Sequence, residues 1–95
     1  MGIEMVVPKE LREKYLQRRE SDIAVLHDAL VTHTFDEFKR IGHQLKGNAA
    51  SFGYNELESI AIRLEKAGEK SDHAEASALL QLFEKWYFNE KKSMV

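Results

Sequence analysis

Apolar residues that recur at helical spacing constrain the fold of this 95-residue chain more than any other feature. Steps of three and four residues place side chains on one side of an α-helix. Between residues 34 and 53 this spacing is kept by Phe35, Phe38, Ile41, Leu45, Ala49 and Phe52. No stretch alternates polar and apolar residues for long enough to predict a strand. The sequence therefore predicts an all-α protein.

Start and stop signals divide the central part of the chain into two helices. Thr34 and Glu37 have the spacing of a capping box, which predicts a helix start, and Gly53 suits the left-handed end of that helix. A further helix is expected from about Asn55, with Gly68 as its stop. Its apolar stripe consists of Leu57, Ile60, Ala61, Leu64 and Ala67.

The N-terminal part predicts a short first helix and a longer second one. Pro8 suits a first helical turn, where its missing N–H costs nothing, and Leu11 with Tyr15 has the spacing of an apolar pair. Ser21 can cap the second helix. Its apolar stripe is Ile23, Leu26 and Leu30. The two helices are either separate or joined through residues 17–20.

The C-terminal part predicts one more helix and completes the expected architecture. Asp72 and Glu75 have the spacing of a second capping box, and a charged tail is expected at residues 89–95. The apolar stripe between them is Ala76, Leu79, Leu80, Phe83, Trp86 and Tyr87. Short loops make neighbouring helices antiparallel. We therefore expect residues 1–95 to be a single domain, an antiparallel up-down four-helix bundle with an additional short N-terminal helix.

Charge and composition exclude several classes of function. The chain has 14 basic and 16 acidic residues, a formal net charge of −2, and its basic residues are interleaved with acidic ones. Nucleic-acid binders usually carry a basic stripe or a recognisable module, so no nucleic-acid partner is expected. No run approaches the roughly 18 apolar residues of a membrane span. There is no cysteine, and the N-terminal segment is too quickly charged to be expected as a secretory signal, so a cytoplasmic location is expected.

One histidine on the central helix is predicted to face outwards. At about 100° of rotation per residue, His43 falls roughly 160° from Leu45, the centre of the buried stripe. Four residues share the outer strip within about 60° of His43 by the same rotation. They are Lys39, Lys46, Gly47 and Ala50. The strip thus combines an imidazole, two ammonium groups and two residues with almost no side chain.

This strip has the properties of a nucleophilic site. Gly47 costs a helix roughly 1 kcal/mol relative to alanine, and it is explained if another molecule must come close to His43. Ala50 leaves similar clearance. An exposed imidazole is largely neutral at pH 7, so one ring nitrogen has a free lone pair while the other donates to an acceptor. Glu65, on the edge of the next helix's stripe, is one candidate for that acceptor.

The other histidines and aromatic residues fit structural roles better than chemical ones. His27, His33 and His73 lack the spacing of a metal-ligand pair, and His27 is expected on the buried side of its helix. No metal site is therefore expected. Helical spacing assigns the aromatic residues of the last helix to the core. They are Phe83, Trp86 and Tyr87, whereas Val31 and Phe88 are expected at the surface.

The segments "HQLKGNAASFG" and "LESIAIRLEKAG" resemble the histidine-containing phosphotransfer (HPt) domain of bacterial phosphorelays. The resemblance covers essentially the whole chain. In that family the histidine matching His43 carries the phosphoryl group, and the lysine matching Lys46 helps to neutralise it. The glycine matching Gly47 leaves room for a receiver domain, and the residue matching Glu65 orients the ring. Asn48 stands where many members have a smaller residue, which predicts crowding beside the site.

The resemblance implies a phosphoryl carrier and not an enzyme, because the chain has no nucleotide-binding loop such as GxxxxGK[ST]. The implied partners are response-regulator receiver domains, a hybrid histidine kinase, or both. No cofactor is expected on this chain, and the Mg²⁺ that phosphoryl transfer uses is expected from the receiver. A monomer without a membrane partner is expected.

Two alternative interpretations remain open from the sequence. The first is a helical adaptor that docks a receiver domain without accepting phosphate. The second is the phosphoacceptor domain of a chemotaxis-type histidine kinase, excised from a longer protein. His43, Lys46 and Gly47 are all in place, which favours a phosphoryl carrier over the adaptor.

Overall fold

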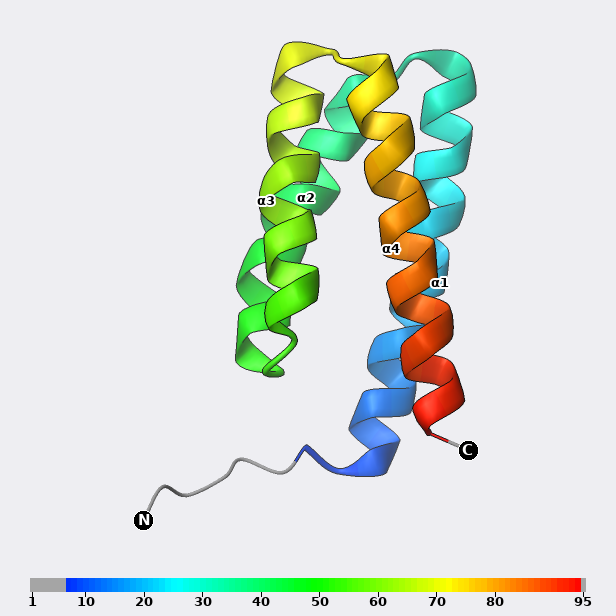
Figure 1. Cartoon of the computed structure of the whole chain (residues 1–95), viewed down its shortest axis with the longest axis vertical. Helices are drawn as coiled ribbons and strands as arrows, with labels where there is room; N and C mark the ends of the chain where they lie inside the picture. The colour runs from blue at the N-terminus through cyan, green and yellow to red at the C-terminus, as the bar shows by residue number, and fades with distance from the viewer. Residues whose placement is uncertain (1–6, 95) are drawn as a thin grey trace.

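The computed structural model describes residues 7–94, and every regular element in that range is helical. The helices are α1 (Lys9–Thr32), α2 (Phe35–Ser51), α3 (Asn55–Lys70) and α4 (His73–Ser93). They run alternately up and down, and their short turns lie at alternate ends of the molecule (Figure 1). The predicted all-α bundle with up-down topology is confirmed for the described residues.

The additional short N-terminal helix was predicted wrongly. Residues 9–32 form one continuous helix, and Ser21, expected to cap a second helix, lies in its interior. The reason is local: residues 17–20 are Gln, Arg, Arg and Glu, all good helix formers, and no glycine or proline interrupts residues 9–32. The described part of the chain therefore has four helices, and residues 1–6 lie outside it.

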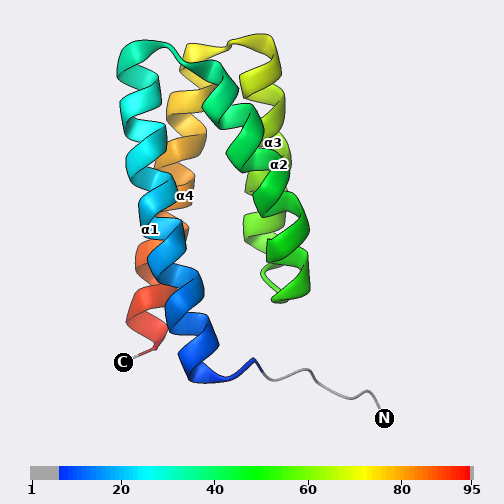
Figure 2. The ribbon, with the colours of Figure 1, turned by 180° about the vertical axis from the view of Figure 1, so that it is seen from behind.

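The four helices form two pairs, α1 with α4 and α2 with α3, as both opposite views show (Figures 1 and 2). The pair α2–α3 makes the most extensive contact. The two pairs are joined at one end by the α1–α2 and α3–α4 turns and diverge towards the α2–α3 turn (Figure 2). The α2–α3 pair is thus the most tightly assembled part of the bundle, and it carries His43 and Glu65.

Two glycines allow α2 and α3 to approach each other this closely. A Cβ atom at Gly42 would lie 2.5 Å from the backbone nitrogen of Glu65, and one at Gly68 would lie 2.4 Å from that of Lys39. Gly68 was predicted to end its helix, and this was wrong. The helix continues to Lys70, and Ser71 adopts the left-handed conformation with φ 51°.

The capping box predicted at Thr34 and Glu37 is not formed. Thr34 does precede α2, but its hydroxyl hydrogen-bonds to that of Thr32 at 2.7 Å, and Glu37 pairs with Arg40. Both side chains find other polar partners, so the reciprocal bonds are lost. The predicted end of the helix is confirmed, because α2 ends at Ser51 and Gly53, with φ 78°, follows the cap residue Phe52.

Only one of the two hydrogen bonds of the second predicted capping box is formed. The Asp72 carboxylate accepts the backbone N–H of Glu75 at 3.1 Å, but the side chain of Glu75 accepts from Arg63 of α3 at 2.8 Å. At its other end α4 continues to Ser93 through most of the segment that was expected to be a tail. Val95 lies outside the described residues.

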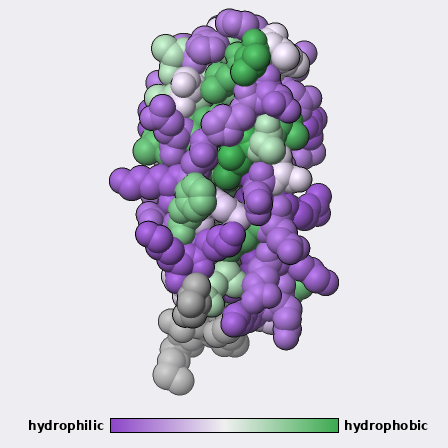
Figure 3. Space-filling view, turned by 90° about the vertical axis from the view of Figure 1, so that its right-hand side faces the viewer, coloured by the Kyte–Doolittle hydropathy of each residue, from purple (hydrophilic) through white to green (hydrophobic). Residues whose placement is uncertain are grey.

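The core contains the predicted apolar stripes. The largest fully buried side chains are Phe38, Phe83, Leu26, Ile41, Leu45, Leu57, Leu64, Leu79 and Leu80. Trp86 and Tyr87 are buried as expected, while Val31 and Phe88 are exposed, also as expected. On the α1–α4 side the surface is mostly hydrophilic, with separate hydrophobic patches (Figure 3). Across residues 7–94, every helix is too short or too polar to cross a lipid bilayer.

The position expected for His27 was wrong. Its side chain is 54% exposed and pairs with Glu84 of α4. The residue lies at the edge of the apolar stripe of α1, from which its imidazole extends to the acidic side chain on the neighbouring helix.

Candidate functional site

His43 projects from the middle of α2 towards solvent, as its rotation from Leu45 predicted. The side chain of His43 is 69% exposed, whereas Leu45 is fully buried. The apolar stripe fixes this direction, because burying Leu45 and its neighbours in the core leaves His43 no other face. The phosphoacceptor candidate is therefore accessible to another macromolecule.

Glu65 of α3 holds both His43 and Lys46. Its Oε2 atom lies 2.8 Å from Nδ1 of His43, and its Oε1 atom accepts a hydrogen bond from Nζ of Lys46 at 2.9 Å. The Glu65 side chain is only 15% exposed. The contact between Gly42 and the backbone of Glu65 brings the two helices close enough for this bridge. The structure thus places the predicted acceptor within hydrogen-bond distance of the predicted histidine.

The charge on Glu65 decides which ring nitrogen of His43 carries the proton. The hydrogen bond from Lys46 is the main cause that lowers the pKa of Glu65, and the hydrogen bond from His43 adds to it against the effect of burial. An ionised carboxylate can only accept hydrogen bonds, so Nδ1 of His43 is the donor. Nε2, the ring nitrogen that does not face Glu65, then has the free lone pair.

The pH dependence of stability should report this interaction. Because the pKa of Glu65 is lowered in the folded state, its contribution to the free energy of unfolding is present above the ordinary value of 4.5 and is lost as pH falls through the lowered value. We expect H43Q to be more stable than H43Q/E65Q at pH 7, with the difference shrinking below pH 4.5. Urea denaturation of both variants at several pH values measures this difference. His43 is replaced in both variants so that protonation of its ring does not contribute to the difference in stability. A difference in the free energy of unfolding that stayed constant down to pH 3 would contradict the interaction.

The surroundings of His43 are open where the sequence predicted clearance. A Cβ atom at Gly47 would meet no atom within 4 Å, and Ala50 is exposed. Lys39 is also exposed and lines a shallow pocket that includes His43 and Glu65. The remaining residues that line this pocket were not singled out from the sequence; they are Asp36, Arg40 and Gln44. Their signal was present, since Asp36 and Arg40 lie seven and three residues before His43 and Gln44 directly follows it.

Asn48 does not crowd the histidine, so that expectation was wrong. Its Oδ1 atom accepts a hydrogen bond from the Tyr15 hydroxyl at 2.7 Å and lies 3.5 Å from Nη1 of Arg19. Asn48 follows His43 by five residues, which turns it by about 140° towards α1. Sequence reasoning missed this polar contact between α1 and α2, although Arg19 lies four residues from both Tyr15 and Ile23 on the apolar side of α1.

The other histidines lie away from His43. The rings of His33 and His73 are 5.0 Å apart, where the α1–α2 and α3–α4 turns meet, and His27 pairs with Glu84. Within residues 7–94, no three His, Cys, Asp or Glu side chains are grouped so that they could hold a metal ion. The candidate site is therefore built from His43, Glu65 and Lys46.

Comparison with known proteins identifies the family. The family model described as Hpt domain matches residues 10–87, which include α2 and α3, most of α1 and α4, and the whole candidate site. No curated protein matches the chain, and no solved structure does. An exposed histidine on the second helix of an antiparallel bundle agrees with the resemblance noted in the sequence. Since the match covers most of its length, the chain belongs to the Hpt domain family, whose members are phosphocarriers of two-component signalling.

Proposed function

We propose that this protein accepts a phosphoryl group on His43 from the phosphoaspartate of a receiver domain and passes it to the aspartate of another. The observation that carries the proposal is the geometry of one ring. His43 is exposed, and its Nδ1 atom is held 2.8 Å from a largely buried carboxylate. That arrangement leaves Nε2 as a nucleophile with a fixed direction.

The transfer step balances without an additional proton acceptor. Nε2 of His43 attacks phosphorus, the N–P bond forms, and the P–O bond to the aspartyl carboxylate breaks. Nδ1 keeps its proton, so the phosphorylated ring is cationic and lies beside the carboxylate of Glu65. Glu65 thus acts as a positioning residue that also stabilises the charge of the product. In the reverse direction, an aspartate carboxylate attacks phosphorus and the neutral ring leaves.

Nearby cations and small residues complete the proposed site. Lys46 and Lys39 place positive charge beside His43, where the oxygens of the phosphoryl group would lie. Gly47 and Ala50 leave the approach to the ring free of long side chains. Phosphoryl transfer also needs a divalent cation at the equatorial oxygens, and we assign the Mg²⁺ ligands to the partner receiver domain.

Intact-mass measurement tests the proposal directly. The protein is mixed with receiver domains that have been phosphorylated by a small phosphodonor and Mg²⁺, and its mass is followed beside that of H43Q. We expect the gain of one acid-labile phosphoryl group, absent in H43Q. If no receiver of a complete set from the source organism transfers phosphate while binding remains detectable, the phosphocarrier proposal fails and a docking adaptor takes its place.

Lys46→Ala should slow transfer without altering the fold. An attraction of about 1 kcal/mol at a solvated surface corresponds to roughly a 5-fold change in rate, so we expect a decrease of about that size. Rapid-quench transfer from a phosphorylated receiver measures the rate, and circular dichroism checks the helicity. Lys66→Ala, at an exposed lysine next to Glu65 in the chain, is the matched control. A rate equal to that of the unmodified protein would remove Lys46 from the mechanism.

A further inference from the structure

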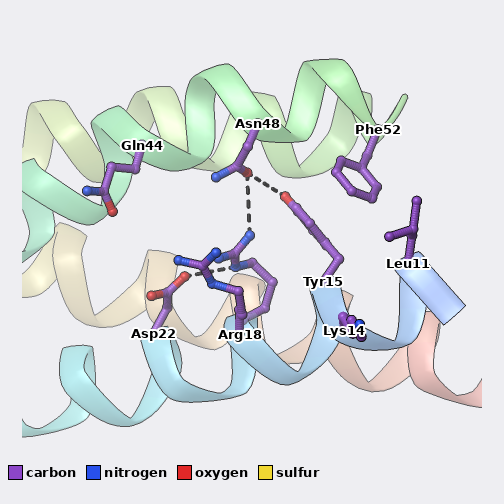
Figure 4. Close-up of a pocket in the computed structure, with 9 residues that line it drawn as sticks. Leu11, Lys14, Tyr15, Arg18, Asp22, Gln44, Asn48 and Phe52 are labelled. Atoms are coloured by element: carbon purple, nitrogen blue, oxygen red, sulfur yellow. Dashed lines mark hydrogen bonds and ion pairs between the residues drawn. The ribbon is translucent and has the colours of Figure 1, made fainter. Parts of the chain in front are cut away.

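A second hollow adjoins the candidate site on the α1 side. This groove between α1 and α2 has a volume of about 520 Å³. It is lined by Leu11, Lys14, Tyr15, Arg18, Arg19, Asp22, Gln44, Asn48 and Phe52 (Figure 4). Gln44 lines both the groove and the pocket at His43, so the two hollows are neighbours along α2. A molecule seated in the groove would therefore lie next to the histidine.

The base of the groove is held by polar contacts between α1 and α2. Asn48 accepts a hydrogen bond from the Tyr15 hydroxyl (Figure 4). Nε of Arg19 donates to Asp22 at 2.8 Å. The guanidinium of Arg19 also lies 4.4 Å from the centre of the Tyr15 ring. Arg19 is 5% exposed, so its charge is used within the protein. These contacts fix the shape of the groove before any partner binds.

The open side of the groove has one apolar end and a cationic middle. Leu11 is 50% exposed and lies beside Phe52 at the end of the groove (Figure 4). Lys14 and Arg18 line the middle, and within residues 7–94 neither takes part in an ion pair. Asp22, the acidic residue of the groove, is already paired with Arg19. Two positive charges without an ion pair thus lie next to an exposed apolar contact.

On the opposite flank of the site, the face of α3 that bears Glu65 carries further acidic side chains. On α3, Glu58 and Glu69 lie seven and four residues from Glu65, which places them on the same face of that helix. An acidic partner that approached His43 over α3 would meet these carboxylates, whereas over α1 it would meet Lys14 and Arg18. Like charges brought together at an interface oppose binding, and opposite charges accelerate it. The groove is therefore the flank that suits an acidic partner.

We propose that the α1–α2 groove seats the receiver domain through an acidic segment with an apolar side chain, and that Lys14 and Arg18 select receivers that carry such a segment. This inference rests on the proposed function. In this arrangement the apolar side chain contacts Leu11 and Phe52, the carboxylates face the two cations, and the phosphoaspartate lies over His43. The selection would act mainly on the rate of encounter, as charges at the rim of an interface do.

Charge-reversal variants test the flank. We expect K14E/R18E to lower the second-order rate constant of transfer from a receiver on the order of 10-fold at low salt. The difference should shrink at high ionic strength, where the Debye length falls from about 8 Å at 0.15 M to about 3 Å at 1 M. K66E reverses a charge on α3 and is the matched control, with little change expected. Phosphorylation of His43 by a small phosphoramidate donor should be equal in all three proteins.

The outcomes separate this inference from the proposed function. If no receiver phosphorylates His43, the proposed function itself fails. If transfer occurs but K14E/R18E leaves its rate unchanged, or if K66E lowers the rate more, then the receiver does not use the α1–α2 groove and the inference is overturned. A loss that also occurs with the small donor would mean that the substitutions disturb His43, and would likewise overturn it.

Discussion

Gly68→Ala is expected to destabilise the protein by about 3 kcal/mol, a large share of the stability of a small domain. A Cβ atom at this position would lie 2.4 Å from the backbone nitrogen of Lys39 and 2.8 Å from the backbone oxygen of Phe35. Both atoms belong to the main chain of α2, so no change of rotamer can relieve the overlap and the two helices must separate. Urea denaturation followed by circular dichroism measures the free energy of unfolding.

Two other glycines of the same helix pair supply matched variants. Gly42→Ala should also be destabilising, because its Cβ atom would overlap the backbone of Glu65. Gly47→Ala should instead stabilise by up to about 1 kcal/mol, since the position is open and alanine is the better helix former. If Gly68→Ala were as stable as Gly47→Ala, the close approach of α2 and α3 would be wrong.

Gly47→Leu is expected to slow transfer from a receiver domain on the order of 100-fold while leaving the fold intact. A leucine here extends into open space and costs little within the protein. It would, however, project beside His43 and keep the phosphoaspartate from reaching Nε2. A displacement of about 1 Å from the reactive geometry is enough for a loss of that order. Rapid-quench measurements of transfer from a phosphorylated receiver give the rate.

A small phosphoramidate donor distinguishes access from reactivity. Such a donor needs little clearance, so it should phosphorylate Gly47→Leu at a rate near that of the unmodified protein. The rate of transfer from a receiver to Gly47→Ala should lie between the rates for Gly47→Leu and for the unmodified protein. Equal receiver transfer in Gly47→Leu and the unmodified protein would show that clearance at this position has no part in docking.

The direction of His43 and its partner could both be predicted from the sequence. The apolar stripe of α2 is long and regular, so its rotation fixes where His43 points. Glu65 was identified by the same count on α3, and the distance of 2.8 Å to His43 agrees with it. Such predictions succeed because they depend on periodicity within one helix, which is a local property.

Apart from the pairing of His43 with Glu65, the contacts between helices could not be predicted in this way. Gly68 has the residue type of a helix stop, and only the position of Lys39 on α2 shows why glycine is needed there. His27 was assigned to the core because its rotation is near that of Ile23, but Glu84 on α4 provides a polar partner at the surface. Asn48 likewise turned out to face α1. Each of these depends on which helices are neighbours and how closely they pack.

The contact at Gly42 has a consequence for how the protein could diversify. Gly42 directly precedes His43, and it touches the main chain of Glu65 itself. The spacing between His43 and Glu65 is therefore set by the contact between the backbones of α2 and α3, and not by side chains at the surface. On the docking proposed for the α1–α2 groove, substitutions there would change the choice of partner without altering that spacing. If the receiver docks in the α1–α2 groove as proposed, one lineage of such domains would be able to exchange its signalling partners while the geometry of His43 and Glu65 stayed the same.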